Sequence, residues 1–521
     1  MRLIPLLYEA QHRHGFLSEA TLRELAREAN VPLHRLQQII SFYPHFRTTP
    51  PPRVELSVCR DMSCYLASGE AGAKKLRELG SADVKVHEVS CIGRCERAPA
   101  AAINGIPVPT ANFEQVKEWV AHPETIPNPR PDAPRTWKCD VERYATISRL
   151  RLSGSADEAI ATLKESGLRG MGGAGFPTDV KWELVRKETG TPKYVICNAD
   201  ESEPGTFKDR EILADLPHLV IEGMMLAGHV VGAAKGILYL RHEYGPEQTR
   251  FETELKRAYA EGILGNGFDI EIFVSPGGYI LGEETALLEA LEDKRGEPRN
   301  KPPFPGTHGL FGQPTLINNV ETLAMATCIL NRGSAWWKSQ GREGFAGLKF
   351  ISVSGHVDKP GVYQIATGTT VRELIEMCGG MKDGMKLFAF APGGASSNFL
   401  PAAQVDVPLD FNAVAKAGSM LGSGALVVVA EGTDMLALGT NVVRFFRNES
   451  CGKCVPCRVG SEKAVEILDG VLAGTTPRTA LSILPELGET MTLTSICGLG
   501  QVAVNPVLSV LKQWPELGKD A

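Results

Sequence analysis

Four cysteines near the C-terminus constrain the fold of this chain more than any other feature. Cys451, Cys454 and Cys457 recur at every third position, and Cys497 follows in a separate segment. Three thiolates at this spacing can bind one iron–sulfur cluster from a single turn of chain, and a distant fourth completes the coordination. Zinc is the main alternative, because C-x-x-C pairs also bind zinc, but zinc usually takes two separated pairs. A disulfide framework is favoured less than zinc, so the quartet predicts an iron–sulfur cluster.

A second quartet of cysteines lies in the N-terminal part of the chain. Cys59 and Cys64 form one pair, Cys91 and Cys95 form the other, and each pair occupies a loop that leaves a predicted strand. The four sulfurs are expected to converge at one end of a sheet and to hold a [2Fe–2S] cluster. A group of structural thiols is the alternative. The C-terminal quartet favours the cluster, because electron-carrying proteins tend to hold clusters in series.

Length, charge and hydropathy exclude several classes of protein. At 521 residues the chain is too long for one core and should form about three to five domains. The net charge of −6 gives no reason to expect nucleic acid as a partner. The most apolar stretch, 219–234, is interrupted by Glu222 and His229 and falls short of a membrane span. The N-terminus lacks the features of a secretory signal, so a cytoplasmic location is expected. In a reducing compartment the remaining cysteines should be small buried side chains: Cys139, Cys197, Cys328 and Cys378.

Periodicity and turn residues divide the chain into six segments. Five prolines within residues 122–136 indicate a stiff extended linker. Strand patterns occur on both sides of this linker, whereas after Met435 the strand signals disappear. The predicted segments are N-terminal helices (1–50), a small α/β module (51–121), the linker (122–145), a long α/β region (146–345), a compact domain of strands and a helix (346–434) and a C-terminal helical bundle (435–521).

A glycine-rich loop, residues 167–177, precedes a predicted helix. Glycines let backbone N–H groups approach a phosphate, and the N-terminus of the helix adds a favourable dipole. The pattern is neither a P-loop nor a G-x-G-x-x-G motif after a strand. Alone, the loop is also consistent with a tight structural turn.

Three further segments place carboxylates and amides near such a loop. Their polar or aromatic residues are Asp200, Glu201, Glu203, Tyr279, Glu283, Glu284, Lys301, Phe304, Asn318 and Asn319. Acidic clusters are usually solvated surface, which is the alternative here. The apolar and glycine neighbours instead favour loop carboxylates that accept hydrogen bonds from flavin hydroxyls and nicotinamide ribose.

These segments resemble the NADH-oxidising flavoprotein subunit of respiratory complex I, and the resemblance covers nearly the whole chain. Residues 1–120, including the run Phe42-Tyr-Pro-His-Phe46, resemble the thioredoxin-fold [2Fe–2S] subunit that partners it. The segments that carry the flavoprotein resemblance are 167–178, 198–209, 279–287, 301–305, 314–323 and 449–458.

The resemblance implies an α/β multidomain fold and a set of cofactor sites. It implies a thioredoxin-like [2Fe–2S] domain, an α/β domain for FMN and NAD(H), a β-grasp domain at 346–434 and a helical bundle with a [4Fe–4S] cluster. FMN would lie against Gly170, Gly172, Lys181, Asn198, Asp200, Glu201, Tyr279, Gly282, Glu283, Glu284, Asn318 and Asn319. NAD(H) would stack on the flavin, with Phe176 and Phe304 flanking adenine and with polar contacts from Glu203 and Lys301. Hydride transfer would need no catalytic side chain, because FMN performs it.

Two departures from the family pattern bear on function. Met171 stands where a basic residue is frequent and Leu281 where a cysteine is frequent, so nucleotide affinity or flavin potential is expected to differ. The fusion of two subunits, with a shortened interval between Cys64 and Cys91, resembles the diaphorase subunits of NAD-dependent formate dehydrogenases or of NAD-reducing hydrogenases.

Residues 336–338 and 498–507 look most like the formate dehydrogenase group. That resemblance implies a molybdenum- or tungsten-containing partner subunit whose electrons reduce NAD⁺, with the [2Fe–2S] site as a relay or a store. The alternatives are a hydrogenase subunit, bifurcating types included, a complex I-type NADH dehydrogenase, or a nucleotide-sensing module without redox function.

Overall fold

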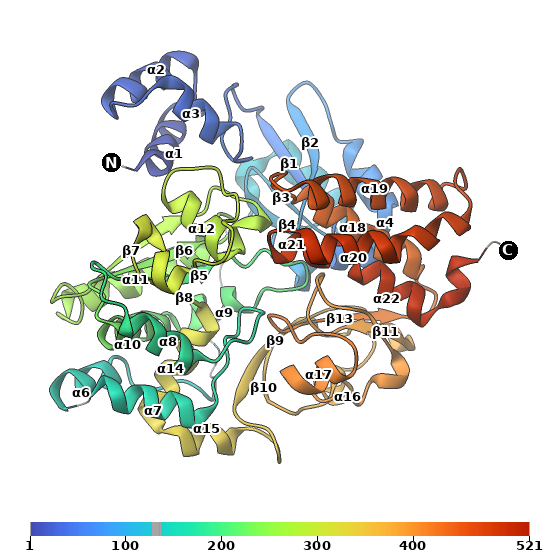
Figure 1. Ribbon diagram of the computed structural model, residues 1–521. Helices are drawn as coiled ribbons and strands as arrows, with labels where there is room; N and C mark the ends of the chain where they lie inside the picture. The colour runs from blue at the N-terminus through green and yellow to red at the C-terminus, as the bar shows by residue number, and fades with distance from the viewer. Residues whose placement is uncertain (1, 128–134, 136, 154, 520–521) are drawn as a thin grey trace.

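The computed structural model describes residues 2–127, 135, 137–153 and 155–519, and Figure 1 shows their arrangement. Much of the predicted proline-rich linker, residues 128–134 and 136, lies outside the described residues. The described ranges form three sheets, one in each of the predicted segments that contain strands, and a helical C-terminal part. The predicted α/β multidomain class is confirmed.

The N-terminal helices pack against the long α/β region. They are α1 (Leu3–His14), α2 (Glu19–Glu28) and α3 (Leu33–Ile40). The carboxylate of Asp293 accepts hydrogen bonds from the backbone N–H groups of Leu3 and Ile4 at 2.7 and 2.8 Å. These N–H groups have no partner inside the helix, so Asp293 caps α1 and fixes it to the neighbouring domain.

The small α/β module contains a four-stranded sheet in the order β2-β1-β3-β4. Its elements are β1 (Val54–Cys59), α4 (Met62–Arg77), β2 (Val84–Val89), β3 (Ala100–Ile103), β4 (Ile106–Pro109) and α5 (Phe113–Ala121). Val54, Leu56 and Val58 alternate along β1 and are buried, as a one-sided core requires. β1 and β2 are parallel, with Cys59 in register with Val89. The two cysteine loops therefore leave the sheet at the same edge, as the sequence predicts.

The long α/β region is built on a parallel sheet in the order β7-β6-β5-β8. The strands are β5 (Tyr194–Ala199), β6 (Lys235–Leu240), β7 (Asp269–Val274) and β8 (Thr315–Asn319). The helices are α6 (Ala145–Ser153), α7 (Ala156–Ser166), α8 (Thr178–Lys187), α9 (Lys208–Asp215), α10 (Pro217–Val231), α11 (Gly245–Ala260), α12 (Glu284–Leu291), α13 (Pro305–His308), α14 (Val320–Arg332) and α15 (Ser334–Gln340).

The strand order of this sheet locates its ligand crevice. The chain runs from β5 to β6 and β7 on one side and then returns to β8 on the other side of β5. In parallel sheets a ligand binds at the carboxyl ends of the strands where the order reverses. The crevice should thus lie beyond Ala199 and Asn319, which end β5 and β8.

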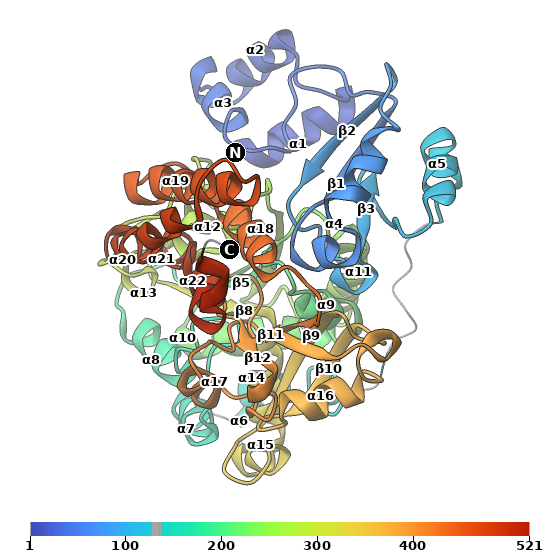
Figure 2. The ribbon, with the colours of Figure 1, turned by 90° about the vertical axis from the view of Figure 1, so that its right-hand side faces the viewer.

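In Figure 2 the third domain, drawn in orange, lies below the red C-terminal bundle. The sheet of the third domain has the order β10-β9-β13-β11-β12, with β9 and β13 parallel. Its elements are β9 (Leu348–Gly355), β10 (Gly361–Ala366), α16 (Val371–Met377), β11 (Leu387–Ala391), β12 (Leu400–Pro401), α17 (Phe411–Lys416) and β13 (Ala425–Ala430). The bundle contains α18 (Met435–Asn448), α19 (Val455–Leu472), α20 (Leu484–Thr494), α21 (Gly498–Val502) and α22 (Asn505–Gln513). α18 packs against α19 and α22 on one side and α4 of the small module on the other.

Candidate flavin and iron–sulfur sites

The N-terminal cysteine quartet is buried between two domains. All four thiols are between 3 and 6% exposed, and the sulfur atoms of Cys91 and Cys95 lie 3.4 Å apart. The backbone N–H of Cys91 donates to the carboxylate of Asp61 at 2.8 Å. Four converging thiols at one edge of a sheet suit the small [2Fe–2S] cluster.

Two arginines of the long α/β region hold the loop of Cys91. The guanidinium of Arg241 donates to the carbonyl oxygens of Cys91 and Glu201, and it pairs with Glu243 at 2.9 Å. Arg210 donates to the carbonyl oxygen of Gly93 at 2.7 Å. Both arginines are buried. Buried positive charge and fixed hydrogen bonds near a cluster are among the factors that set its reduction potential.

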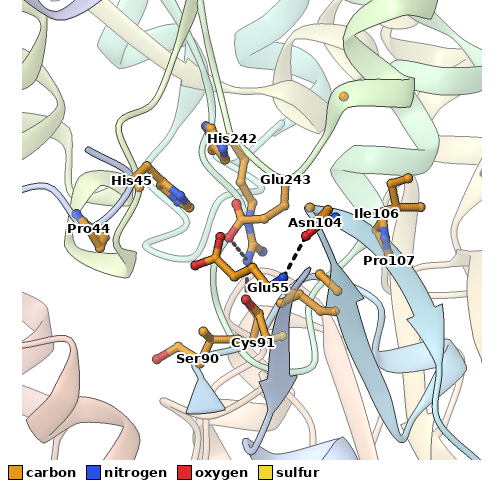
Figure 3. Close-up of a pocket in the computed structure, with 18 of the residues that line it drawn as sticks. Pro44, His45, Glu55, Ser90, Cys91, Asn104, Ile106, Pro107, His242 and Glu243 are labelled. Atoms are coloured by element: carbon orange, nitrogen blue, oxygen red, sulfur yellow. Dashed lines mark hydrogen bonds and ion pairs between the residues drawn. The ribbon is translucent and has the colours of Figure 1, made fainter. Parts of the chain in front are cut away.

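A large cleft lies beside this loop and not at the predicted flavin crevice. It encloses about 2570 Å³, and Figure 3 shows Ser90 and Cys91 near His45, His242 and Glu243 on its walls. The rings of His45 and His242 stack with centroids 3.8 Å apart. Burial lowers the pKa of His45 to about 4, so this ring is neutral at physiological pH. Among the predicted flavin and nucleotide residues, Tyr279 alone lines this cleft.

The C-terminal quartet surrounds a small cavity at the edge of the helical bundle. Cys457 is buried, whereas Cys451, Cys454 and Cys497 are half-buried. The lining residues are Ile280, Pro298, Ser450, Cys451, Lys453, Cys454, Cys457, Ile496, Cys497 and Leu499. All four predicted ligands thus face one space, which fits a [4Fe–4S] cluster. Burial raises the pKa of Cys457 to about 11, so cluster assembly must displace its proton.

The predicted flavin residues meet at the carboxyl ends of β5 and β8. Asn198 and Asn319 are in register across these strands. The side-chain N–H of Asn198 donates to the carbonyl oxygen of Gly282 at 2.9 Å, which draws the 279–282 turn to the strand ends. A Cβ on Gly172 would lie 2.9 Å from the Cβ of Asn319, so the glycine loop approaches β8 as closely as a backbone can.

Asp200 supplies a test of whether this crevice fits a polar ligand. Its Oδ2 atom is buried and has no hydrogen-bond partner among the described residues. Burial raises the pKa of Asp200 to about 8, an increase that Arg241 partly offsets. A buried carboxyl group without a partner is costly unless a ligand pairs with it. The unpaired carboxyl group directly after β5 therefore suits a ligand with hydroxyl groups, such as the polyol of FMN.

Two lysines and two glutamates form a charged cluster beside the crevice. The ammonium group of Lys301 lies 3.0 Å from Glu283 and 3.3 Å from Glu284, and that of Lys181 lies 3.4 Å from Glu284. Burial alone would raise the pKa of Glu284, but the two lysines lower it below its usual value. Phe176 and Phe304 are about half-exposed, so both rings are available for stacking.

Some of the predicted contact residues already use their side chains within the protein. The carboxylate of Glu201 accepts hydrogen bonds from the backbone N–H groups of Asp209 and Arg210 and so caps α9. Burial raises the pKa of Glu201 to about 8. The Oδ1 atom of Asn318 accepts a hydrogen bond from Trp182 at 2.9 Å. These side chains shape the crevice walls, and their direct contacts with FMN remain predictions.

Glu203 bridges the long α/β region to the third domain. Its carboxylate accepts hydrogen bonds from the backbone N–H and the hydroxyl of Ser396, each at 2.6 Å, and from the hydroxyl of Tyr279 at 2.7 Å. Burial raises its pKa, an effect that these hydrogen bonds partly offset. The predicted contact of Glu203 with NAD(H) stays a prediction.

Sequence reasoning did not identify a network of buried charges beneath the crevice. Glu321 pairs with Lys208 at 2.7 Å and with Lys349 of the third domain at 2.6 Å. Burial lowers the pKa of Lys349 to about 8. Arg241 was missed as well, although its place directly after β6, at the carboxyl edge of the sheet, is a signal that could have found it.

Four known domain families match this chain. The matches are "Thioredoxin-like [2Fe-2S] ferredoxin" over residues 1–123, "Nuo51 FMN-binding domain" over 163–327, "SLBB domain" over 350–399 and "NADH-ubiquinone oxidoreductase-F iron-sulfur binding region" over 437–520.

Complete proteins and solved structures give the same result. The F subunit of the NADH-quinone oxidoreductase of Streptomyces coelicolor is 42% identical over 395 residues, which cover 74% of this chain and 88% of the relative. The corresponding F subunit of Escherichia coli is 40% identical over 429 residues, which cover 77% and 94%. A chain of an NAD⁺-reducing [NiFe]-hydrogenase in the H₂-reduced state superposes with a TM-score of 0.90 at 32% identity, covering 99% of this chain and 93% of that one.

The fold and the two cysteine quartets define an iron–sulfur flavoprotein. The chain belongs to the family of NADH-quinone oxidoreductase F subunits and carries a thioredoxin-like [2Fe–2S] domain at its N-terminus. It is an electron-transfer subunit of the NADH dehydrogenase, or diaphorase, type, with FMN, NADH, a [2Fe–2S] and a [4Fe–4S] cluster as cofactors. Zinc and non-redox alternatives are thereby set aside. No helix in the described ranges is long and apolar enough to cross a membrane.

Proposed function

We propose that this chain is the diaphorase subunit of an NAD-dependent formate dehydrogenase, in which a molybdenum- or tungsten-containing subunit oxidises formate. Electrons enter from that partner and leave as hydride on NAD⁺, in the cytoplasm. When bound, FMN exchanges hydride with NAD(H) and single electrons with iron–sulfur clusters.

One observation carries the electron-transfer role. In the turn formed by residues 279–282, Tyr279 is a predicted flavin contact, and the next residue, Ile280, lines the cavity of the C-terminal cysteines. The same turn is tied to β5 through Asn198. One short turn therefore borders both the predicted flavin contact and the cysteine cavity, and transfer between them needs no catalytic acid or base.

The choice of formate as the electron source is supported by sequence resemblance. Residues 336–338 and 498–507 resemble the formate dehydrogenase group, and 498–507 directly follows the fourth cysteine of the [4Fe–4S] quartet. That position favours a role in contact with a partner or in adjusting the cluster.

A hydrogenase partner is the second candidate, because one solved chain has the same fused architecture. The NAD⁺-reducing [NiFe]-hydrogenase chain covers 99% of this chain, whereas the relative from E. coli covers 77%. A separate complex I-type dehydrogenase is therefore the weaker alternative.

The surface around the C-terminal quartet is suited to docking a redox partner. Val455 directly follows Cys454, Leu493 lies four positions before Cys497, and the two side chains are 58 and 75% exposed. Exposed apolar side chains that cluster beside a cofactor are typical of interaction sites. We place the electron-donating subunit on this surface.

The test is purification of the native complex under anaerobic conditions, with metal analysis and with NAD⁺ reduction assayed separately with formate and hydrogen. Molybdenum or tungsten together with formate-dependent NAD⁺ reduction is the expected result. Nickel with hydrogen-dependent reduction would replace the formate assignment by the hydrogenase one. The isolated chain should oxidise NADH with an artificial acceptor and leave formate untouched.

A further inference from the structure

Helix α18 contacts the first cysteine loop of the [2Fe–2S] site. The side chain of Asn441 accepts a hydrogen bond from the backbone N–H of Met62 and donates one to the carbonyl oxygen of Arg60, both at 2.9 Å. Both backbone groups lie between Cys59 and Cys64. Asn441 is buried, where an amide needs hydrogen-bond partners, and a loop from another domain pairs with both its oxygen and its nitrogen.

The residue that directly follows this helix contacts the second cysteine loop. Glu449 accepts a hydrogen bond from the hydroxyl of Ser90, which directly precedes Cys91. Its other carboxylate oxygen accepts a hydrogen bond from the backbone N–H of Tyr279 at 2.8 Å. One carboxylate thus joins the [2Fe–2S] loop to the turn that borders the flavin crevice.

The chain then enters the [4Fe–4S] site without an intervening loop. Ser450 and Cys451 follow Glu449 directly, and the hydroxyl of Ser450 lies 3.2 Å from the sulfur of Cys457. α18 is largely buried between α4, α19 and α22, so its two contact residues are fixed relative to each other.

We propose that Glu449 is a positioning residue shared by both cluster sites and the flavin crevice, with Asn441 as the second attachment point on α18. Glu449 would hold the loop of Cys91, the turn of Tyr279 and the start of the Cys451 segment in one geometry. The inference requires the cofactors of the family but does not depend on whether formate or hydrogen supplies the electrons.

The carboxylate should also affect both clusters through its charge. A reduced cluster is more negative than an oxidised one, so a fixed negative charge between two clusters opposes reduction of each. Removal of that charge is expected to shift both midpoint potentials in the positive direction.

Hydrogen exchange of the full-length chain tests the positioning role. Glu449→Ala should increase exchange about tenfold in residues 88–93 and 279–282, because each segment loses a charge-assisted hydrogen bond. Asn441→Ala should increase exchange in residues 60–64 and leave 279–282 unchanged. A uniform increase over all three segments in both variants would indicate general destabilisation of α18 and would overturn the proposal.

Redox titration followed by electron paramagnetic resonance tests the charge without loss of side-chain length. Glu449→Gln should move the midpoint potentials of both clusters upward, and Glu449→Asp should leave them near the wild-type values. Glu462→Gln is the matched control, because Glu462 is an exposed residue of the same bundle that pairs with Arg447 at 3.5 Å. Potentials that move in one cluster only, or no more than in the Glu462→Gln control, would refute a shared role.

Discussion

The two cysteine quartets offer the same ligand type in opposite surroundings. The N-terminal quartet is buried throughout, and its loop is held by Arg210 and Arg241 from another domain. The C-terminal quartet leaves three of its four cysteines half-buried beside exposed apolar side chains. The spacing of the cysteines determines that each quartet can hold a cluster. The surrounding domains determine whether that cluster is enclosed within the chain or lies near the surface, where a partner subunit can bind.

This difference separates an internal site from an outward-facing one. The loop of Cys91 depends on interdomain hydrogen bonds, so its cluster is coupled to the stability of the whole assembly. The segment of Cys454 lies in the helical bundle, where Lys453 donates a hydrogen bond to the carbonyl oxygen of Pro298, and it borders the surface, where a partner subunit can approach it. The following substitutions test this contrast, beginning with the largest expected effect.

Loss of a cysteine ligand should affect each region separately. Cys91→Ser and Cys454→Ser should each abolish the paramagnetic signal of their own cluster, because a thiolate ligand is lost. Cys91→Ser should also lower the temperature of unfolding, whereas Cys454→Ser should change it little. Iron content and thermal unfolding provide the measurements, and loss of the [2Fe–2S] signal in Cys454→Ser would contradict the assignment.

Removal of the buried arginine should destabilise the inner region strongly. Arg241→Met removes the ion-pair partner of Glu243, which is partly exposed, and removes the guanidinium donor to the carbonyl oxygen of Cys91. A buried acceptor that loses its donor costs about 1–3 kcal/mol. Arg372→Met is the control, because Arg372 pairs with Asp406 on the surface and such pairs contribute at most about 1 kcal/mol. Equal shifts of the denaturant midpoint in the two variants would argue against an arginine-held loop.

The architecture could be predicted from the sequence wherever the signal is local. Alternating Val54, Leu56 and Val58 predicted β1, and the apolar run that ends at Cys197 predicted β5. Predicted segment boundaries and contacts with FMN and NAD(H) remain predictions, because ligand-contacting atoms cannot be assigned from spacing.

Contacts between distant parts of the chain could not be predicted. Arg241 and Cys91 are 150 positions apart, and Glu449 and Ser90 are 359 apart. Periodicity reports which face of an element is buried, but it carries no information about the domain that covers that face. Arg210, Arg241 and Glu449, which hold the inner cysteine loop from other domains, are of this kind.

The raised pKa of Asp200 should make the stability of the folded protein depend on pH. In the flavin-free protein, Asp200 keeps its proton up to a pKa of about 8, whereas the unfolded chain releases it near 3.8. The native state therefore binds more protons between these values, and its stability should fall as pH rises from about 4 to about 8, by at most about 1.4 kcal/mol per unit.

Asp200→Asn removes this linkage and should flatten the pH dependence. Hydrogen exchange of β5 and β8, corrected for its intrinsic dependence on pH, is the measurement, and α19 and α20 of the outward-facing region serve as the internal reference. An unchanged slope in Asp200→Asn would show that another group binds the proton.

The smallest effect on folding, and a selective effect on function, is expected at the surface beside the outer quartet. Leu493→Asp replaces a 75% exposed apolar side chain, so the stability of the isolated chain should change by no more than about 0.5 kcal/mol. If a partner buries this side chain, a charge there should weaken docking about tenfold or more. NAD⁺ reduction driven by the partner should then fall, while NADH oxidation with an artificial acceptor should not.

Leu152→Asp is the matched control, because Leu152 is 88% exposed on α6, outside this surface. Equal losses in both variants would mean that the partner does not bind beside the outer quartet, and the contrast between an internal and an outward-facing cluster would lose its functional meaning.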